Sequence, residues 1–294
     1  MWCFFALLAS LTNAVYYLFN QNSRLRPSLF MVYRGFFLAI AATPFALFYL
    51  HIFPWQFYFI ALLQGFMISY SDFRYFQAFQ KFGAENVTSI SPLTVIIMFF
   101  IWFLFKPDII FSYLSTPMRS ALIIASIVVI VISVMKYRAQ AIGLECCRFL
   151  MPVLFVCALI NISNKIIMQY ADQHLLTATI TRVALTGFVI GVINLFIGLR
   201  RDLKAKEIMA LDSLKRGVYI LLLALSMICL NFSMHYTENP AYTSAIIYLS
   251  VVWIILINKV RSFGGYKQPY QKLKKRWIFA LLIATSVLSV VTCM

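Results

Sequence analysis

Apolar runs of membrane length dominate the pattern of hydrophobic and polar positions along the chain. Charged residues, Pro and Gly interrupt these runs and divide the sequence into ten hydrophobic segments. A bilayer core needs roughly 20 mostly apolar residues per helix, so each segment is long enough to be read as a span. The predicted spans cover residues 2–19, 28–50, 55–71, 86–105, 120–135, 149–170, 176–199, 217–235, 240–258 and 277–293. The pattern predicts an all-α membrane protein with ten transmembrane helices.

Composition supports a membrane environment and excludes a nucleic-acid partner. The 294 residues are 63% hydrophobic and 12% charged, whereas a soluble chain carries about 25% charged residues. The net charge of +16 could indicate nucleic-acid binding. Proteins of that kind, however, gather their cations on a water-exposed face, and so apolar a chain has little such face. We therefore expect the lipid bilayer, and no nucleic acid, as a partner.

The cations are distributed unevenly between the two predicted faces of the membrane. Twenty of the 25 Lys and Arg residues fall in the odd-numbered connections between spans, and the even-numbered connections hold only Lys106 and Arg119. Short cytoplasmic loops retain Lys and Arg. We expect the odd-numbered loops in the cytoplasm, both termini outside, and a location in the bacterial inner (plasma) membrane.

Ten spans divide into five and five, which suggests an internal duplication. The proposed halves are residues 1–140 and 141–294. A shift of 155 lays Val87-Thr88-Ser89 on Tyr242-Thr243-Ser244, at the starts of the fourth and ninth spans. An odd number of spans per half turns the second copy upside down relative to the first. We therefore predict two inverted five-helix repeats, an architecture of transporters that places the substrate site between the halves.

The first two spans resemble a known transporter family. Asn13, Tyr16 and Tyr17 give the first span a polar and aromatic face, Pro27 lies in the following loop, and Arg34 stands seven residues into the second span. This order resembles the ten-helix, EamA-like branch of the drug/metabolite transporter superfamily. The resemblance implies a transporter that moves a small polar metabolite by alternating access through a central cavity.

A second stretch is similar to the same family, and three features depart from it. Residues 75–93, ending in Ser91-Pro92-Leu93, are similar to the family's third-to-fourth helix signature of small residues followed by Pro-Leu. Lys106 replaces the acidic residue often found where the fourth helix ends, and Ile246-Ile247 stands where the second half would repeat Ser91-Pro92. Family members also commonly place both termini in the cytoplasm, which differs from the distribution of cations in this chain.

Three cations lie inside predicted spans, namely Arg34, Lys165 and Arg182. A charge at the centre of a membrane helix costs about 2.5–3.5 kcal/mol on insertion scales, so each requires a reason. A shift of 148 aligns the two arginines, which either brace helix ends near the interface or bind substrate. Lys165 lies four residues after Asn161, so the two share a helix face that we expect to line a cavity.

The predicted substrate site combines these cations with amide and aromatic side chains of other spans. Its residues are Asn13, Tyr17, Arg34, Asn161, Asn164, Lys165, Arg182, Asn231, Tyr242 and Tyr248. All nine acidic residues are expected in loops or at helix ends, so no buried carboxylate is predicted for cation coupling. Buried cations without buried anions favour a substrate that carries a carboxylate or phosphate, such as an amino acid or organic anion.

We therefore expect a transporter and not an enzyme, with a small-molecule substrate, no cofactor and no metal, as a monomer or homodimer. Gly187 and Gly191 form a small-residue face that we expect to pack inside the bundle. Two other functions stay open. A lipid scramblase or flippase fits the basic loops, and an intramembrane transferase fits less well because His51, His174 and His235 are isolated.

Overall fold

Every secondary-structure element that the computed structural model describes is an α-helix. The structure describes residues 1–22, 27–49, 51–82, 87, 90–136, 144–171, 174–201, 221–263 and 275–293. The helices are α1 (Trp2–Asn22), α2 (Pro27–Phe48), α3 (Trp55–Phe82), α5 (Leu93–Phe105), α6 (Asp108–Ser115), α7 (Pro117–Lys136), α8 (Leu144–Gln169), α9 (Leu175–Arg201), α12 (Leu221–Tyr236), α13 (Pro240–Ile247), α14 (Ser250–Phe263) and α15 (Lys275–Cys293).

The apolar helices confirm the class of an α-helical membrane protein. Within the described ranges, six helical segments are long and apolar enough to cross a membrane, or up to seven if the bent pair α5 and α6 is one span. Trp2–Tyr16 and Leu221–Tyr236 add shorter apolar helices. Every predicted span overlaps one of the helices, but the number of crossings, ten, stays a prediction.

Large apolar side chains cover the outside of the bundle. Phe48 and Leu104 are 80% and 81% exposed, and such residues recur on most helices. A protein in water rarely leaves so much apolar surface uncovered. This surface is what lipid chains would cover, and it agrees with a protein embedded in the membrane.

The helix α3 continues well past the predicted end of its span at residue 71. Backbone hydrogen bonds carry the helix on through a polar segment to Phe82. Asp72 therefore lies inside a helix, ten residues before its end, and the expectation that all acidic residues occupy loops or helix ends is wrong at this position. The apolar pattern marks the part of a helix suited to lipid and does not mark where the helix ends.

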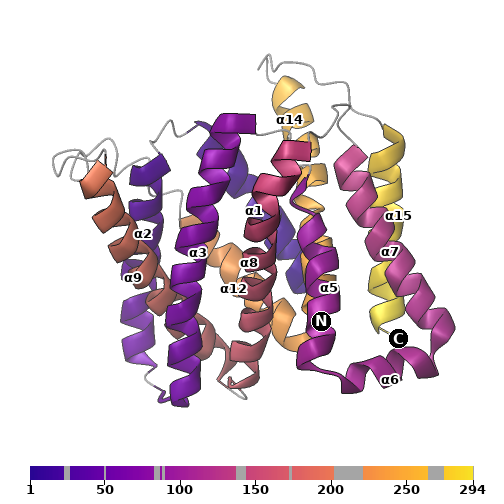
Figure 1. Cartoon of the computed structure of the whole chain (residues 1–294), viewed down its shortest axis with the longest axis horizontal. Coiled ribbons are helices and arrows are strands. Elements are labelled where there is room, and N and C mark those ends of the chain that lie inside the picture. Colours follow the sequence, from indigo (N-terminus) through magenta and orange to yellow (C-terminus); the bar gives the residue numbers. More distant parts are fainter. Residues whose placement is uncertain are drawn as a thin grey trace.

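A sharp bend follows α5. The axes of α5 and α6 differ by 112° across Lys106 and Pro107. Pro107 supplies no backbone N–H, and Pro117 begins α7, so both prolines favour a break in the helix at these positions. Figure 1 shows α6 at the lower right, between the lower ends of α5 and α7, in the half of the bundle where the N and C termini are also marked.

Two helix pairs occupy opposite edges of the molecule. Figure 1 shows α2 and α9 at the left edge, α7 and α15 at the right edge, and α1, α3, α5, α8 and α12 between them. A methyl group on Gly35 of α2 would overlap the backbone of Gly191 in α9, and one on Gly187 would lie 2.9 Å from the backbone N of Ala39. The two helices are therefore antiparallel and in backbone contact, which confirms that Gly187 and Gly191 pack inside the bundle.

The packing partners follow a regular order when the helices are numbered as ten successive spans, with α13 and α14 together as the ninth. The second packs on the seventh (α2 on α9), and the fifth packs on the tenth (α7 on α15). The first packs on the eighth (α1 on α12), and the third packs on the sixth (α3 on α8). If the first five spans exchange numbers with the last five, so that the first becomes the sixth and the sixth becomes the first, the same four pairs result. Two related halves would give this pattern, although the inverted repeat itself stays a prediction.

The fourth and ninth spans are both interrupted, and the interruptions touch. Pro92 precedes the first residue of α5, and the ninth span changes from α13 to α14 at Tyr248 and Leu249. The Tyr248 hydroxyl donates a hydrogen bond of 2.9 Å to the carbonyl oxygen of Ser91. Tyr248, predicted in the substrate site, thus joins the two helix breaks.

Candidate functional site

Four helices meet at a buried group of polar side chains, called here the Arg182 network. It consists of Gln64 from α3, Ser163 and Asn164 from α8, Arg182 from α9 and Asn231 from α12. Arg182 donates through Nε to Gln64 Oε1 (2.8 Å) and through Nη1 to Asn231 Oδ1 (3.1 Å). Gln64 Nε2 donates in turn to Ser163 Oγ (2.7 Å) and Asn164 Oδ1 (2.8 Å). The network therefore cross-links helices of both predicted halves.

The guanidinium of Arg182 is buried without a carboxylate partner among the described residues. The residue is 1% exposed, and within the described part of the chain no Asp or Glu forms an ion pair with it. Amide oxygens of Gln64 and Asn231 satisfy two of its N–H groups, but they do not cancel a full positive charge. Burying an unpaired charge is costly, so an anionic ligand group near Arg182 would stabilise the buried guanidinium.

The Arg182 network lies between the lower end of the bundle and its middle. Arg182 stands seven residues after the start of α9, and Gln64 stands nine residues after the start of α3. At 1.5 Å per residue these positions are about 10 and 14 Å along their helices. Both helices start at the end of the bundle that carries the termini (Figure 1).

A cavity of about 510 Å³ opens beside the network at the same end. Its walls come from the bend between α5 and α6, the last turns of α8, and the end of α12 with the residues that follow it. The lining residues are Trp102, Lys106, Asp108, Ile109, Ser112, Lys165, Gln169, Tyr236, Thr237 and Glu238. The volume matches the range of small-molecule sites, which begins at about 300 Å³.

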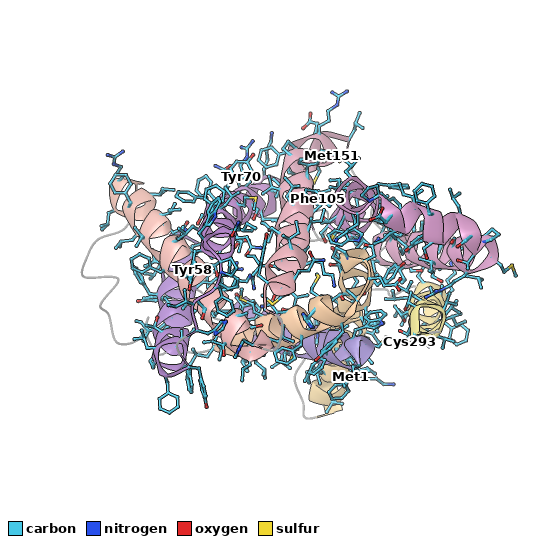
Figure 2. All side chains as sticks on the ribbon, turned by 90° about the horizontal axis from the view of Figure 1, so that it is seen from below. Met1, Tyr58, Tyr70, Phe105, Met151 and Cys293 are labelled. Atoms are coloured by element: carbon cyan, nitrogen blue, oxygen red, sulfur yellow. The ribbon has the colours of Figure 1, made fainter. Side chains whose placement is uncertain are left out.

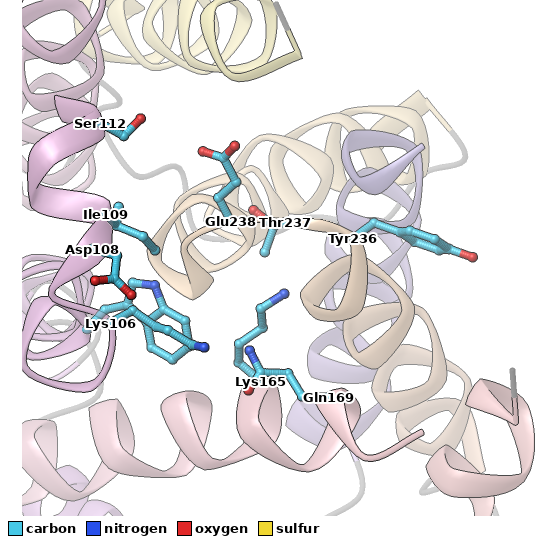
Figure 3. A pocket seen from close by; sticks show the side chains of 10 residues that line it. Lys106, Asp108, Ile109, Ser112, Lys165, Gln169, Tyr236, Thr237 and Glu238 are labelled. Atoms are coloured by element: carbon cyan, nitrogen blue, oxygen red, sulfur yellow. The ribbon is translucent and has the colours of Figure 1, made fainter. Parts of the chain in front are cut away.

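Lys165 connects the cavity with the network. Its ammonium group donates a hydrogen bond of 2.9 Å to the carbonyl oxygen of His235 in α12. His235 is four residues after Asn231, on the same face of α12, and Lys165 directly follows Asn164 in α8. Figure 3 shows the Lys165 side chain extending from α8 toward the end of α12. A ligand in the cavity would therefore meet two cations, Lys106 and Lys165, and Asn164 of the network directly precedes Lys165 in α8.

The cavity carries both signs of charge. Lys106 and Lys165 are joined there by Asp108 and Glu238 (Figure 3). Both acids lie where the sequence placed them, Asp108 at the start of α6 and Glu238 in the turn after α12, and both are exposed. The bend after α5 and the turn after α12 bring two acidic residues from outside the spans to the end of α8. A ligand with both a carboxylate and an ammonium group complements this arrangement better than a simple anion.

Arg34 lies outside the network and has a carboxylate partner. Its Nη1 forms an ion pair with Asp72 Oδ2 between α2 and α3. The two side chains are 18% and 22% exposed. The predicted grouping of Arg34 with Arg182 in one site is therefore not observed, because Asp72 in the extended α3 neutralises Arg34 locally.

The remaining predicted site residues lie around these groups. Asn161 is half-buried and donates through Nδ2 to the carbonyl oxygen of Cys157 in its own helix (3.0 Å). Tyr242 is buried in an apolar cluster, with its ring centroid 6.2 Å from that of Trp2. Asn13 is half-buried on α1. The position of Tyr17 is helical, but its side chain lies outside the described part of the structure.

Sequence reasoning missed the residue that joins the Arg182 network together. Gln64 is 0% exposed and contacts both α8 and α9. An uncharged amide does not interrupt an apolar run, so counting charges passed over it. Its place inside the predicted span 55–71 was the available signal, because an amide in a membrane helix needs hydrogen-bond partners from other helices.

Neither a metal site nor a family assignment follows from the data. Among the described residues, no group of three or more His, Cys, Asp or Glu side chains could hold a metal ion. No protein-family model matches the chain. No curated protein matches it either. The resemblance to the drug/metabolite transporters therefore stays an expectation from the residues quoted above.

Proposed function

We propose that this protein is a membrane transporter for a small polar metabolite that carries a carboxylate and an ammonium group, with amino acids as the leading class. The main support for this proposal is the cavity at the lower end of the bundle. Two cations and two acids line it, and the buried Arg182 network lies beside it. Lys165 and Lys106 attract the carboxylate, and Asp108 and Glu238 attract the ammonium group.

Alternating access gives the cavity its function. The two five-helix halves move against each other, and the site opens first to one side of the membrane and then to the other. The regular packing order supports this proposal, because related halves have two similar arrangements available. Contact between the interrupted fourth and ninth spans supports it as well, since broken helices lie near the substrate in transporters built from inverted repeats.

The proposed orientation follows the cations. The odd-numbered loops lie in the cytoplasm of a bacterial inner membrane, and the cavity then opens on the outside with the termini. An epitope at Met1 that is labelled on intact cells supports this orientation. Labelling only after the membrane is permeabilised contradicts it.

Counterflow in proteoliposomes tests the function. Vesicles containing the purified protein are loaded with an unlabelled mixture of amino acids, and entry of labelled amino acids, organic anions or sugars is followed. We expect saturable entry of one or more amino acids that depends on the internal load. Vesicles without protein provide the background.

A fluorescent lipid in the same vesicles separates the second candidate. Solute exchange with an unchanged lipid distribution supports the transporter. Lipid movement without exchange of any solute class contradicts it and indicates a scramblase.

A further inference from the structure

Two cysteines from opposite ends of the chain lie in contact. Cys3 is in the first turn of α1, and Cys293 is the last residue of α15. Their Sγ atoms are 3.5 Å apart, although the residues are 290 positions apart in sequence. Cys293 is exposed and Cys3 is half-buried. The other cysteines are Cys146, Cys147, Cys157 and Cys229.

The contact joins the ends of two helices, α1 and α15, whose main packing partners differ. The helix α15 packs mainly on α7 at the outer edge, whereas α1 packs on α12, α13 and α14. A hydrogen bond of 3.1 Å from Arg119 Nε to the carbonyl oxygen of Val291 holds the end of α15 against α7. Figure 2 shows Met1 and Cys293 on the same side of the molecule. A bond between Cys3 and Cys293 would tie the outer pair to the central helices.

We infer that Cys3 and Cys293 form a disulfide when they meet a small-molecule disulfide such as oxidised glutathione. The exposed Cys293 thiolate attacks one glutathione sulfur, forms a mixed disulfide and releases one glutathione thiolate. The Cys3 thiolate then attacks the Cys293 sulfur, forms the protein disulfide and releases the second glutathione thiolate. The two protons lost by the cysteines pass to the two released thiolates, so one oxidised glutathione becomes two reduced ones.

The positions of Cys3 and Cys293 favour a stable disulfide bond. The two Sγ atoms are 3.5 Å apart and need to approach by about 1.5 Å to reach the disulfide bond length of about 2.05 Å. The cations predict that both termini lie outside the cytoplasm, where disulfides persist. A link across 290 positions also restricts the unfolded chain strongly and should raise stability.

Peptide mapping by mass spectrometry tests the inference. The purified full chain in detergent is treated with oxidised glutathione, the remaining thiols are blocked, and the digest is read without reduction. We expect one peptide pair that joins the segments containing Cys3 and Cys293 within a single molecule. Thermal unfolding should move to a higher temperature on oxidation and return with reductant.

Two variants make the result specific. The variant Cys293→Ser should lose both the peptide pair and the thermal shift, and the control Cys146→Ser/Cys147→Ser should keep both. The inference is overturned if Cys3 and Cys293 each end as free thiols or glutathione adducts. It is equally overturned if mixing tagged and untagged protein shows that the bond forms between two molecules. Neither readout depends on transport, so the proposed function stands or fails separately.

Discussion

Two arginines at related places in the two predicted halves have opposite surroundings. Arg34 of α2 pairs with Asp72 and is partly exposed, whereas Arg182 of α9 is buried among amides with no acidic partner in the described chain. The same side chain therefore occupies two different electrostatic environments. At Arg34 the charge is cancelled inside the protein and braces α2 against α3. At Arg182 only amide oxygens pair with the guanidinium among the described residues, and we propose that the anionic group of the substrate supplies the missing charge.

The two arginines also lie at similar depths from opposite ends of the bundle. Each is seven residues after the first residue of its helix, and α2 and α9 are antiparallel. In the proposed transport cycle, the ion pair of Arg34 and Asp72 closes the side away from the cavity. In the same proposal, the Arg182 network lies beside the open side and holds the anionic group of the substrate.

Replacing Arg182 should have the largest effect. The variant Arg182→Gln removes the buried charge and leaves the network amides with fewer donors. Hydrogen bonds to charged groups contribute about 1.5–3 kcal/mol, so KM for exchange should rise by about tenfold to a hundredfold. Concentration-dependent counterflow measures it. The control Arg200→Gln changes an exposed arginine of the same helix and should behave like the wild type. Equal loss in both variants would point to general damage to α9.

Giving Arg182 a carboxylate partner like that of Arg34 should have the next largest effect on KM. The variant Gln64→Glu places a carboxylate beside Arg182, as Asp72 stands beside Arg34. Cancelling the charge should raise KM by about tenfold, although the carboxylate can no longer donate to Ser163 and Asn164. Gln77→Glu is the control, because it adds the same charge to the same helix near Arg74. An unchanged KM in Gln64→Glu would separate Arg182 from substrate binding.

Breaking the ion pair should affect stability more than affinity. Asp72→Asn leaves Arg34 without its counter-charge, and the cost should be about 1–3 kcal/mol, between the values for exposed and buried pairs. Thermal unfolding of Asp72→Asn, Arg34→Gln and the double variant measures it. The double variant should be less destabilised than the sum of the single ones. Strict additivity would mean that the two residues do not interact.

The smallest effect is expected at Lys165. The variant Lys165→Ala removes one of two cations from the cavity, while Lys106 and Arg182 keep part of the attraction. KM for substrates with a carboxylate should rise by roughly threefold to tenfold. Lys136→Ala, at the exposed end of α7, is the matched control. If transport of every carboxylate substrate stayed unchanged, the charge argument about the substrate would be wrong.

The apolar pattern predicted the positions of the helices well because burial in lipid demands long hydrophobic runs. It could not predict what a helix does beyond its run. Asp72 was placed at a helix end because the apolar segment stops at residue 71, whereas α3 continues to Phe82. The short helix α6 was missed because its eight residues, bounded by Pro107 and Pro117, are too few to be read as a span.

The candidate site was predicted in part. Lys165, Asn164, Arg182 and Asn231 were identified from the sequence as polar residues in spans, and the structure brings them together. Their contacts depend on which helices pack together, which no local pattern contains. Gln64 was missed because an amide carries no charge. The acids of the cavity were missed because they come from a bend and a turn outside the predicted spans.

The most direct measurement compares the two arginines in one assay. Counterflow of an amino acid is measured against concentration for the wild type, Arg34→Gln and Arg182→Gln in the same vesicles. If Arg182 holds the substrate and Arg34 braces the opposite side, Arg182→Gln should raise KM by at least about tenfold. Arg34→Gln should change mainly the maximal rate and leave KM within roughly threefold. An equal rise of KM in both variants, or a larger rise in Arg34→Gln, would contradict the account.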